Sequence, residues 1–169
     1  GLAARRLVER FGYPDAVRKL EFDRNRAIVG LVIDKRNGHL LKLSRFSKVK
    51  LAYHGFEEID FRERREIYRE RAIDLRDPDF QSLDTAFAIS NGVLFAQLVE
   101  MKKNNSDIPD FRKIYFDVNQ CIDSLHKDGT LKNILRADFS KYVIRDPRTA
   151  AMLERMKTYD KKLMIITNS

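Results

Sequence analysis

Residues 116–132, FDVNQCIDSLHKDGTLK, separate into an apolar and a polar stripe when they are wound as a helix. At about 100° per residue, four apolar side chains fall at positions i, i+3, i+4 and i+7 of one face: Val118, Cys121, Ile122 and Leu125. A polar edge beside this face carries three further side chains: Asn119, Asp123 and His126. A helix that packs through its apolar stripe would therefore hold an amide, a carboxylate and an imidazole side by side at the rim of its packing surface.

The sequence also predicts where this helix ends and where a new one begins. Gly129, after Asp128, can adopt the left-handed conformation that closes a helix without a Cβ clash. Thr130 is expected to cap a short new helix that carries Lys132.

The composition predicts one folded domain, or one domain and part of another. The chain has 169 residues, 43% of them hydrophobic, and a net charge of +8 that favours anionic partners. A single cysteine excludes an internal disulfide and fits a reducing compartment. The sequence has neither an apolar run of about 18 residues nor a signal-peptide pattern, so we expect a soluble cytoplasmic protein.

The first part of the chain predicts short helices and then a small antiparallel sheet. Residues 2–11 have helical spacing that ends at Gly12, and Pro14 suits the first turn of a second helix. The Asn37-Gly38 pair tolerates the positive φ of a tight hairpin turn. Strands are expected at residues 27–34, 39–43 and 48–53.

Residues 60–77 are dense in arginine and glutamate, and two interpretations stay open. The ordinary one is a solvated surface segment with exposed ion pairs. The sharper one is a binding site for an anion or an effector.

The remaining segments predict mainly helices. Residues 79–89 are expected to wind with Phe80, Leu83 and Phe87 on one side, and Ser90-Asn91-Gly92 to break that helix. Further helices are expected at residues 93–103, from about residue 110 after a polar loop, and at residues 147–157 after the Asp146 cap. Residues 163–166 form an apolar run typical of a strand buried on both faces.

Taken singly, the polar side chains leave the function open. Thr167, Asn168 and Ser169 follow the predicted strand, where hydroxyl and N–H groups can hold a phosphate, but hydroxyl residues follow strands in many loops. His126 fits a surface histidine as well as a catalytic one, and Cys121 fits a small buried apolar residue. The sequence has no metal-ligand spacing, glycine-rich phosphate loop or nucleophile elbow.

Several segments, taken together and in order, resemble the cytosolic purine 5′-nucleotidases, which belong to the haloacid-dehalogenase-like phosphatases. These segments are VGLVIDKRNGHLLKL (residues 29–43), YHG (53–55), LDTAF (83–87), DVNQCIDSLHKDGTLK (117–132), KYVIRD (141–146) and MIITNS (164–169). DGTLK and ITNS are the most specific of them. In that family, the stretch between the first and second catalytic motifs carries a cap that closes over the nucleotide, and this chain resembles that stretch.

The resemblance implies an α+β or α/β fold, namely a mostly helical cap with a small antiparallel sheet, followed by one helix and one strand of a Rossmann-like phosphatase core. It implies four parts: a helical lead-in at residues 1–26, a β-meander at 27–56, the helical cap at 57–145, and the core helix and strand at 146–169.

The resemblance also implies roles for individual residues. The second catalytic motif would bind the phosphate through Thr167, Asn168 and Ser169. Phe87 and His126 match the rings on the two sides of the base, and Asp123 matches the carboxylate that reads the purine edge. The full implied set for the base is Phe87, Asn119, Asp123, His126 and Lys132.

Three further positions qualify this match. Asn119 and Ala88 depart from the family pattern, which has arginine and asparagine there. Arg76 lies near a family arginine linked to nucleotide effectors, which makes it a possible effector residue.

Hydrogen-bond chemistry supports the role of Asp123. A 6-oxopurine has an N1–H that a carboxylate accepts, whereas adenine would leave the carboxylate unpaired. An unpaired buried polar group costs about 1–3 kcal/mol, enough for roughly tenfold to hundredfold discrimination. Asn119 has an amide that can donate to O6 of such a base. The expected substrates are therefore IMP and GMP.

The catalytic residues that the resemblance implies are absent from these 169 residues. The superfamily attacks the phosphate with an aspartate of a D-x-D-x-T/V motif, forms an aspartyl-phosphate and uses Mg²⁺. We therefore expect this chain to be a fragment that is inactive alone, with the Mg²⁺ ligands elsewhere. The resemblance further implies a homo-oligomer. We expect the protein to bind a purine nucleoside monophosphate and a nucleotide effector, and neither a membrane nor nucleic acid.

Two other functions stay open. A basic helical module for RNA or an acidic partner would show steep salt dependence and would use Arg62, Arg64, Arg65, Arg69 and Arg71. A catalytically silent relative would keep the cap and lack the nucleophile.

Overall fold

The computed structural model describes residues 1–28, 30–69 and 71–166. The chain divides into two compact units, Gly1–Asp128 and Gly129–Ser169. Within the described residues there are seven α-helices and one five-stranded antiparallel sheet, so the predicted mixed α/β class is confirmed. The four-part division of the sequence stays a prediction.

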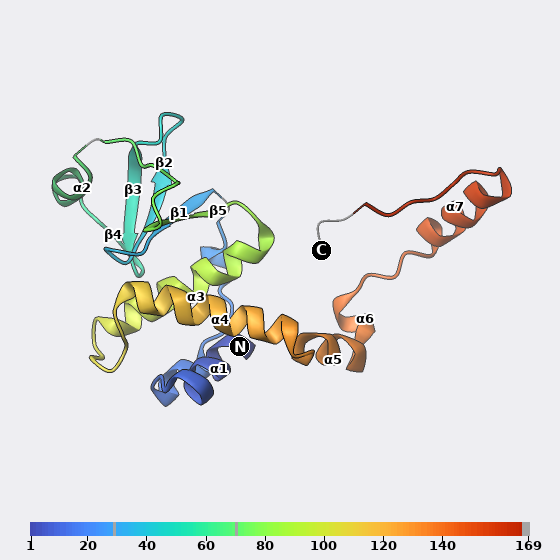
Figure 1. Cartoon of the computed structure of the whole chain (residues 1–169), viewed down its shortest axis with the longest axis horizontal. Coiled ribbons are helices and arrows are strands. Elements are labelled where there is room, and N and C mark those ends of the chain that lie inside the picture. Colours follow the sequence, from blue (N-terminus) through green and yellow to red (C-terminus); the bar gives the residue numbers. More distant parts are fainter. Residues whose placement is uncertain (29, 70, 167–169) are drawn as a thin grey trace. The chain divides into compact units, whose positions relative to one another are not determined.

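The first unit contains the sheet, whose strand order is β4-β3-β2-β1-β5 (Figure 1). The strands are β1 (Leu31–Asp34), β2 (His39–Leu43), β3 (Val49–His54), β4 (Glu57–Glu58) and β5 (Phe80–Leu83). The predicted hairpin is confirmed, because Asp34 pairs with His39 across it and Gly38 has a φ of 73° in its turn. The predicted third strand is confirmed as β3.

The helix predicted at residues 79–89 is wrong in its first half, and the break predicted at residues 90–92 is also wrong. Residues of β5 pair with the edge of β1, Leu83 opposite Leu31, so sheet hydrogen bonds override the helical spacing. Helix α3 (Ala86–Lys102) runs without interruption through Gly92. A side chain at Gly92 would collide with Leu83, so this glycine permits close packing of the helix on the strand.

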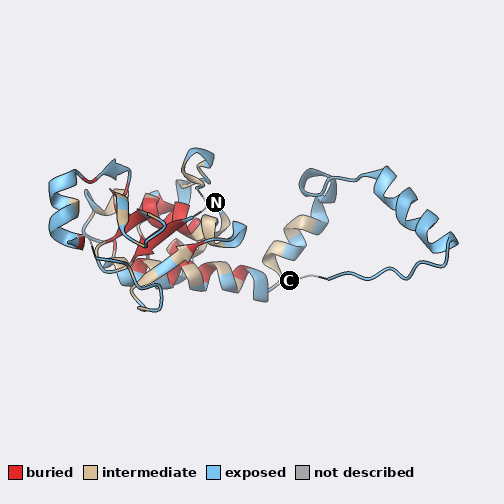
Figure 2. Ribbon diagram, turned by 90° about the horizontal axis from the view of Figure 1, so that it is seen from above, coloured by how far each residue is buried: buried red, intermediate tan, exposed pale blue. Residues whose placement is uncertain are grey.

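Helices stack beneath the sheet in successive layers. Helix α3 contacts the sheet, α4 (Phe111–Lys127) contacts α3, and α1 (Leu2–Phe11) contacts α4 (Figure 1). The buried residues, red in Figure 2, concentrate in these packed elements, and their core cluster includes Leu7, Ile33, Phe95, Leu98 and Val118. The predicted apolar stripe of α4 is confirmed, since Val118, Cys121 and Leu125 are buried and Ile122 is half-buried.

Two short 3₁₀ helices, Asp15–Lys19 and Arg24–Arg26, connect α1 to the sheet. Pro14 is the residue before the first of them, with a ψ of 145°, and not a member of its first turn as predicted. The first predicted strand is also shorter than expected: it begins at Leu31, after Gly30 has turned the chain with a φ of 83°.

The opposite face of the sheet has its own small core beneath helix α2 (Phe61–Tyr68). Asp60 caps α2 by accepting from the backbone N–H groups of Arg62 and Glu63. The buried members of this core are Val32, Leu41, Ala52, Ile59 and Tyr68. Tyr68 therefore anchors the arginine-rich segment to the sheet.

A buried polar network joins α2 to the β1–β2 hairpin. Tyr68 donates its hydroxyl proton to Asp34 Oδ2 at 2.7 Å, so His39 Nδ1, also at 2.7 Å from that hydroxyl, must carry a proton and donate. Asp34 also accepts from the backbone N–H groups of Arg36 and Asn37. Burial, followed by the nearby His54, lowers the pKa of His39 to about 4, which keeps its ring neutral.

Acidification is expected to destabilise the first unit through His39. Above pH 6.5, the ring is neutral in both folded and unfolded chains; between pH 6.5 and 4 only the unfolded chain gains a proton. At pH 4 this difference in proton binding lowers the free energy of unfolding by about 3 kcal/mol. Urea titrations at pH 7 and pH 4.5 check it against His39→Gln, which can still donate to Tyr68 but does not titrate. An equal loss of stability in both proteins would contradict the prediction.

The second unit contains α5 (Thr130–Ala137), α6 (Phe139–Tyr142) and α7 (Pro147–Thr158). The Asp146 cap is confirmed, because its carboxylate accepts from the backbone N–H of Arg148 at 3.0 Å. Thr130 is not the cap of α5: Gly129, with a φ of 80°, precedes the helix and Thr130 is its first residue.

The strand predicted at residues 163–166 is not formed in the described part of the second unit. Met164, Ile165 and Ile166 are extended and more than four-fifths exposed, and they have no ladder partner there. A strand requires a neighbour to satisfy its N–H and C=O groups, and an apolar run alone does not supply one.

Candidate functional site

Helices α3 and α4 of the first unit position the candidate site. Thr85 caps α3 by accepting from the N–H of Ala88 at 3.2 Å, which fixes where the helix begins. Phe87 follows two residues after that cap. On α4, Asp123 and His126 lie on the polar edge and are exposed, while the apolar stripe is packed against the core. The amphipathic pattern of α4 therefore places these two side chains at the rim, as predicted.

A pocket of about 400 Å³ lies between these helices, and we call it the α3–α4 pocket. Its lining residues are Gln81, Leu83, Thr85, Phe87, Ala88, Asn91, Tyr115, Ile122, Asp123, His126 and Lys127. Three of the predicted base-binding side chains, Phe87, Asp123 and His126, are thus brought together. The pocket has an aromatic side, an acidic group and several amide and hydroxyl groups.

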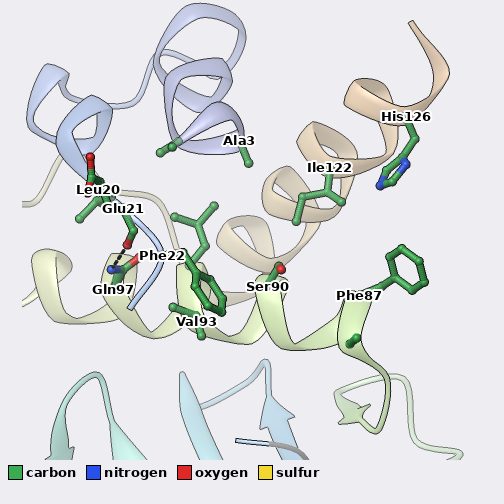
Figure 3. A pocket seen from close by; sticks show the side chains of 14 residues that line it. Ala3, Leu20, Glu21, Phe22, Phe87, Ser90, Val93, Gln97, Ile122 and His126 are labelled. Carbon is green, nitrogen blue, oxygen red and sulfur yellow. Dashed lines mark hydrogen bonds between the residues drawn. The ribbon is translucent and has the colours of Figure 1, made fainter. Parts of the chain in front are cut away.

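An adjoining, more apolar pocket of about 420 Å³ extends toward α1 and the segment around Phe22. Figure 3 shows Phe87 and His126 at one end of it and Leu20, Glu21 and Gln97 at the other. Because Phe87, Ile122 and His126 line both pockets, these three side chains separate a polar compartment from an apolar one.

The rings of Phe87 and His126 lie next to one another in the lining of the α3–α4 pocket. Their centroids are 6.2 Å apart and their planes are inclined by 67°, an edge-on arrangement. The side chain of Phe87 is 67% exposed. A planar ligand placed between the two rings would require Phe87 to turn its face toward it.

Asn119 lies beside the pocket and not among its lining residues. Its carbonyl accepts a hydrogen bond from the side chain of Asn91, and its side chain also hydrogen-bonds Tyr115. Burial, the largest effect, raises the pKa of Tyr115, which keeps its hydroxyl protonated. The amide of Asn119 is therefore engaged by two neighbours that the sequence reasoning did not connect with it.

Asn91 and Tyr115 are pocket residues that the sequence reasoning missed. Phe87 and Asn91 are four residues apart, which places them on one face of a continuous helix. Tyr115 is four residues before Asn119 on α4 in the same way. Because a helix break was predicted at residues 90–92, Asn91 was not expected to share a helix face with Phe87.

The other predicted site residues are not among the lining residues of the α3–α4 pocket, except Ala88. Lys132 is exposed on α5 in the second unit, and Thr167, Asn168 and Ser169 lie outside the described residues. Arg76 is paired with Asp74 through two hydrogen bonds, of 3.0 and 2.9 Å, on the surface. Ala88 lines the α3–α4 pocket, where it presents only a methyl group.

The described residues contain no group of three or more His, Cys, Asp or Glu side chains that could hold a metal ion. In the same part of the chain, no helix has both the length and the apolar character needed to cross a membrane.

Comparison with known proteins identifies the family. Residues 1–169 match the model of the 5′ nucleotidase family. The chain is 29% identical to human 5′-nucleotidase domain-containing protein 2 over 174 residues, which covers 96% of this chain and 34% of the relative. The rat protein of the same name is 28% identical over 96% of this chain and 32% of its own length.

A 5′-nucleotidase domain-containing protein of Dictyostelium discoideum is similarly related. It is 27% identical over 99% of this chain and 29% of its own length. The chain thus spans about a third of the length of the curated relatives it matches. With the family model matched from end to end, the chain belongs to the 5′ nucleotidase family.

Proposed function

We propose that this chain supplies the base-selecting part of a 5′-nucleotidase that hydrolyses purine nucleoside monophosphates, with IMP and GMP preferred. One observation carries the proposal: an aromatic pair, Phe87 and His126, shares a pocket with the carboxylate of Asp123. Flat faces suit a nucleobase and a carboxylate suits its N1–H donor. Family membership supports a nucleotide as the ligand.

Within this proposal, the aromatic and acidic pocket residues and the neighbouring Asn119 have defined tasks. Phe87 and His126 would hold the base by stacking on its two faces. Asp123 would accept from N1–H, which adenine lacks. Asn119, held by Asn91, would fix the position of Tyr115 at the pocket wall and not contact the base directly.

The proposal assigns phosphate binding to Thr167, Asn168 and Ser169, and base contact also to Lys132. Hydrolysis would proceed through an aspartyl-phosphate on an aspartate outside these 169 residues, and Mg²⁺ would neutralise the phosphate charge there. An effector role for Arg76 and the assembly of a homo-oligomer are further proposals from the same resemblance.

Phosphate release by the full-length protein tests the proposed function. Initial rates with Mg²⁺ are measured on IMP, GMP, AMP and UMP. We expect kcat/KM for IMP and GMP to exceed that for AMP by roughly tenfold to hundredfold, with UMP poorer still because it stacks less surface. Equal values for the four nucleotides would contradict the base-selecting role. Binding without hydrolysis of any of them would instead indicate a silent relative.

A further inference from the structure

A basic groove between β3 and α2 is separate from the α3–α4 pocket in its residues and its chemistry. It has a volume of about 300 Å³ and is lined by Lys48, Val49, Lys50, Phe61, Arg64, Arg65 and Tyr68. Four of these seven side chains are cationic and two are aromatic. No carboxylate is among the lining residues that the structure describes.

The periodicity of α2 and the position of two lysines at the start of β3 explain why positive charge gathers in the groove. On α2, the lining positions fall at i, i+3, i+4 and i+7, namely Phe61, Arg64, Arg65 and Tyr68, whereas Glu63 and Glu66 fall on the far side of the helix. Lys48 and Lys50 flank Val49 at the start of β3, where the pairing with β2 shifts in register, and both line the groove. Packing of Tyr68 into the small core holds α2 against the sheet, and the basic residues of α2 and of the start of β3 therefore line the same groove.

Three of the four cations in the groove form no ion pair with an acidic side chain among the described residues, so their charge is available to a ligand. Lys48, Lys50 and Arg64 take part in none of the ion pairs found among the described residues. The Arg64 guanidinium lies over the ring of Phe61, 5.4 Å from its centroid, which orients it at the groove wall. Phe61 itself is 60% exposed.

We propose that this groove binds a polyphosphate group. Several like charges converge on one hollow, and an anion with several negative charges relieves their mutual repulsion better than a single phosphate does. Arginine can contact phosphate oxygens in pairs, and lysine adds a mobile point charge. The cations are gathered in one hollow and not spread along a track, so a compact polyanion fits the site better than a nucleic-acid strand.

Calorimetric titration of the chain with inorganic tripolyphosphate tests the proposal. We expect saturable binding of one ligand per chain that weakens as salt is added. The K48Q/K50Q double variant should lose about tenfold or more in affinity. K161Q/K162Q removes the same charge from exposed positions of the second unit and should bind as the parent chain does.

Further arms of the experiment decide between ligands. Should the double variant fail to fold, as judged by circular dichroism, Arg64→Gln replaces it and should weaken binding severalfold. No saturable binding, or binding that both double variants lower equally, would overturn the proposal. Orthophosphate that binds as tightly as tripolyphosphate would overturn the polyphosphate preference. A single-stranded RNA that binds more tightly than tripolyphosphate, and that K48Q/K50Q weakens, would assign this face to nucleic acid instead.

Discussion

Replacing Asp123 by alanine in the full-length protein is expected to lower the preference for GMP over AMP by roughly tenfold to hundredfold. The carboxylate lines the α3–α4 pocket beside Phe87 and His126. It would accept from the N1–H of guanine and would remain unpaired opposite adenine. Loss of the carboxylate should therefore lower kcat/KM for GMP more than for AMP, and the ratio of the two values measures the effect.

Two matched variants sharpen this prediction. Asp107→Asn removes one exposed acidic charge from the loop between α3 and α4, outside the pocket, and should leave the ratio unchanged. Asp123→Asn keeps the size of the side chain but offers adenine a donor, so it should erode the preference as well. A GMP to AMP ratio that survives both substitutions at position 123 would remove Asp123 from base recognition.

Replacing Asp34 by alanine is expected to lower the free energy of unfolding by about 3 kcal/mol, because it leaves buried donors without an acceptor. Asp34 is 1% exposed and accepts from the hydroxyl of Tyr68 at 2.7 Å and from the side chain of Asn37 at 2.8 Å. It also holds the hairpin turn through two backbone N–H groups. Urea unfolding followed by circular dichroism measures the loss.

The network predicts an order of effects at neighbouring positions. Asp34→Asn keeps one carbonyl acceptor and should cost less than Asp34→Ala. Tyr68→Phe removes one hydroxyl, leaves the ring in the small core and should cost about 1–2 kcal/mol. If the free energy of unfolding of Asp34→Ala is within about 0.5 kcal/mol of that of the parent chain, the effect is that of an ordinary surface substitution. The network then does not stabilise the fold.

Local signals in the sequence were sufficient to predict those features of the fold that depend on residues close together in the chain. The hairpin depends on a turn that Gly38 makes possible, and the apolar stripe of α4 depends on spacing within one helix. The Asp146 cap is likewise a contact between near neighbours. Each of these features is decided within a few residues, so each could be predicted.

Features that depend on distant partners could not be predicted in this way. Residues 80–83 have helical spacing, yet the open edge of β1 makes them a strand. The apolar run at residues 163–166 has no neighbour among the described residues and stays extended. The Asp34–Tyr68–His39 network joins residues up to 34 positions apart, and no local pattern indicates it.

The candidate site shows the same division. Asp123 and His126 were predictable because they share one edge of α4, whereas their approach to Phe87 depends on the packing of α3 on α4. Asn91 was missed because Asn91 and Gly92 suggested a helix break. In the structure α3 continues through both residues, and Gly92 serves instead to let the helix pack closely on Leu83 of β5. Lys48 and Arg64 line one groove because α2, anchored by Tyr68, packs on the sheet, and no local pattern indicates that packing.

Photoaffinity labelling tests the central claim, that the α3–α4 pocket binds the purine base, most directly. The full-length protein is irradiated with 8-azido-GMP, and the labelled peptides are mapped by mass spectrometry. Adducts are expected in the α3 segment around Phe87 and in the α4 segment around His126, and excess GMP should suppress them more than excess AMP does. Labelling confined to other segments, or labelling at these two that excess GMP does not suppress, would contradict it.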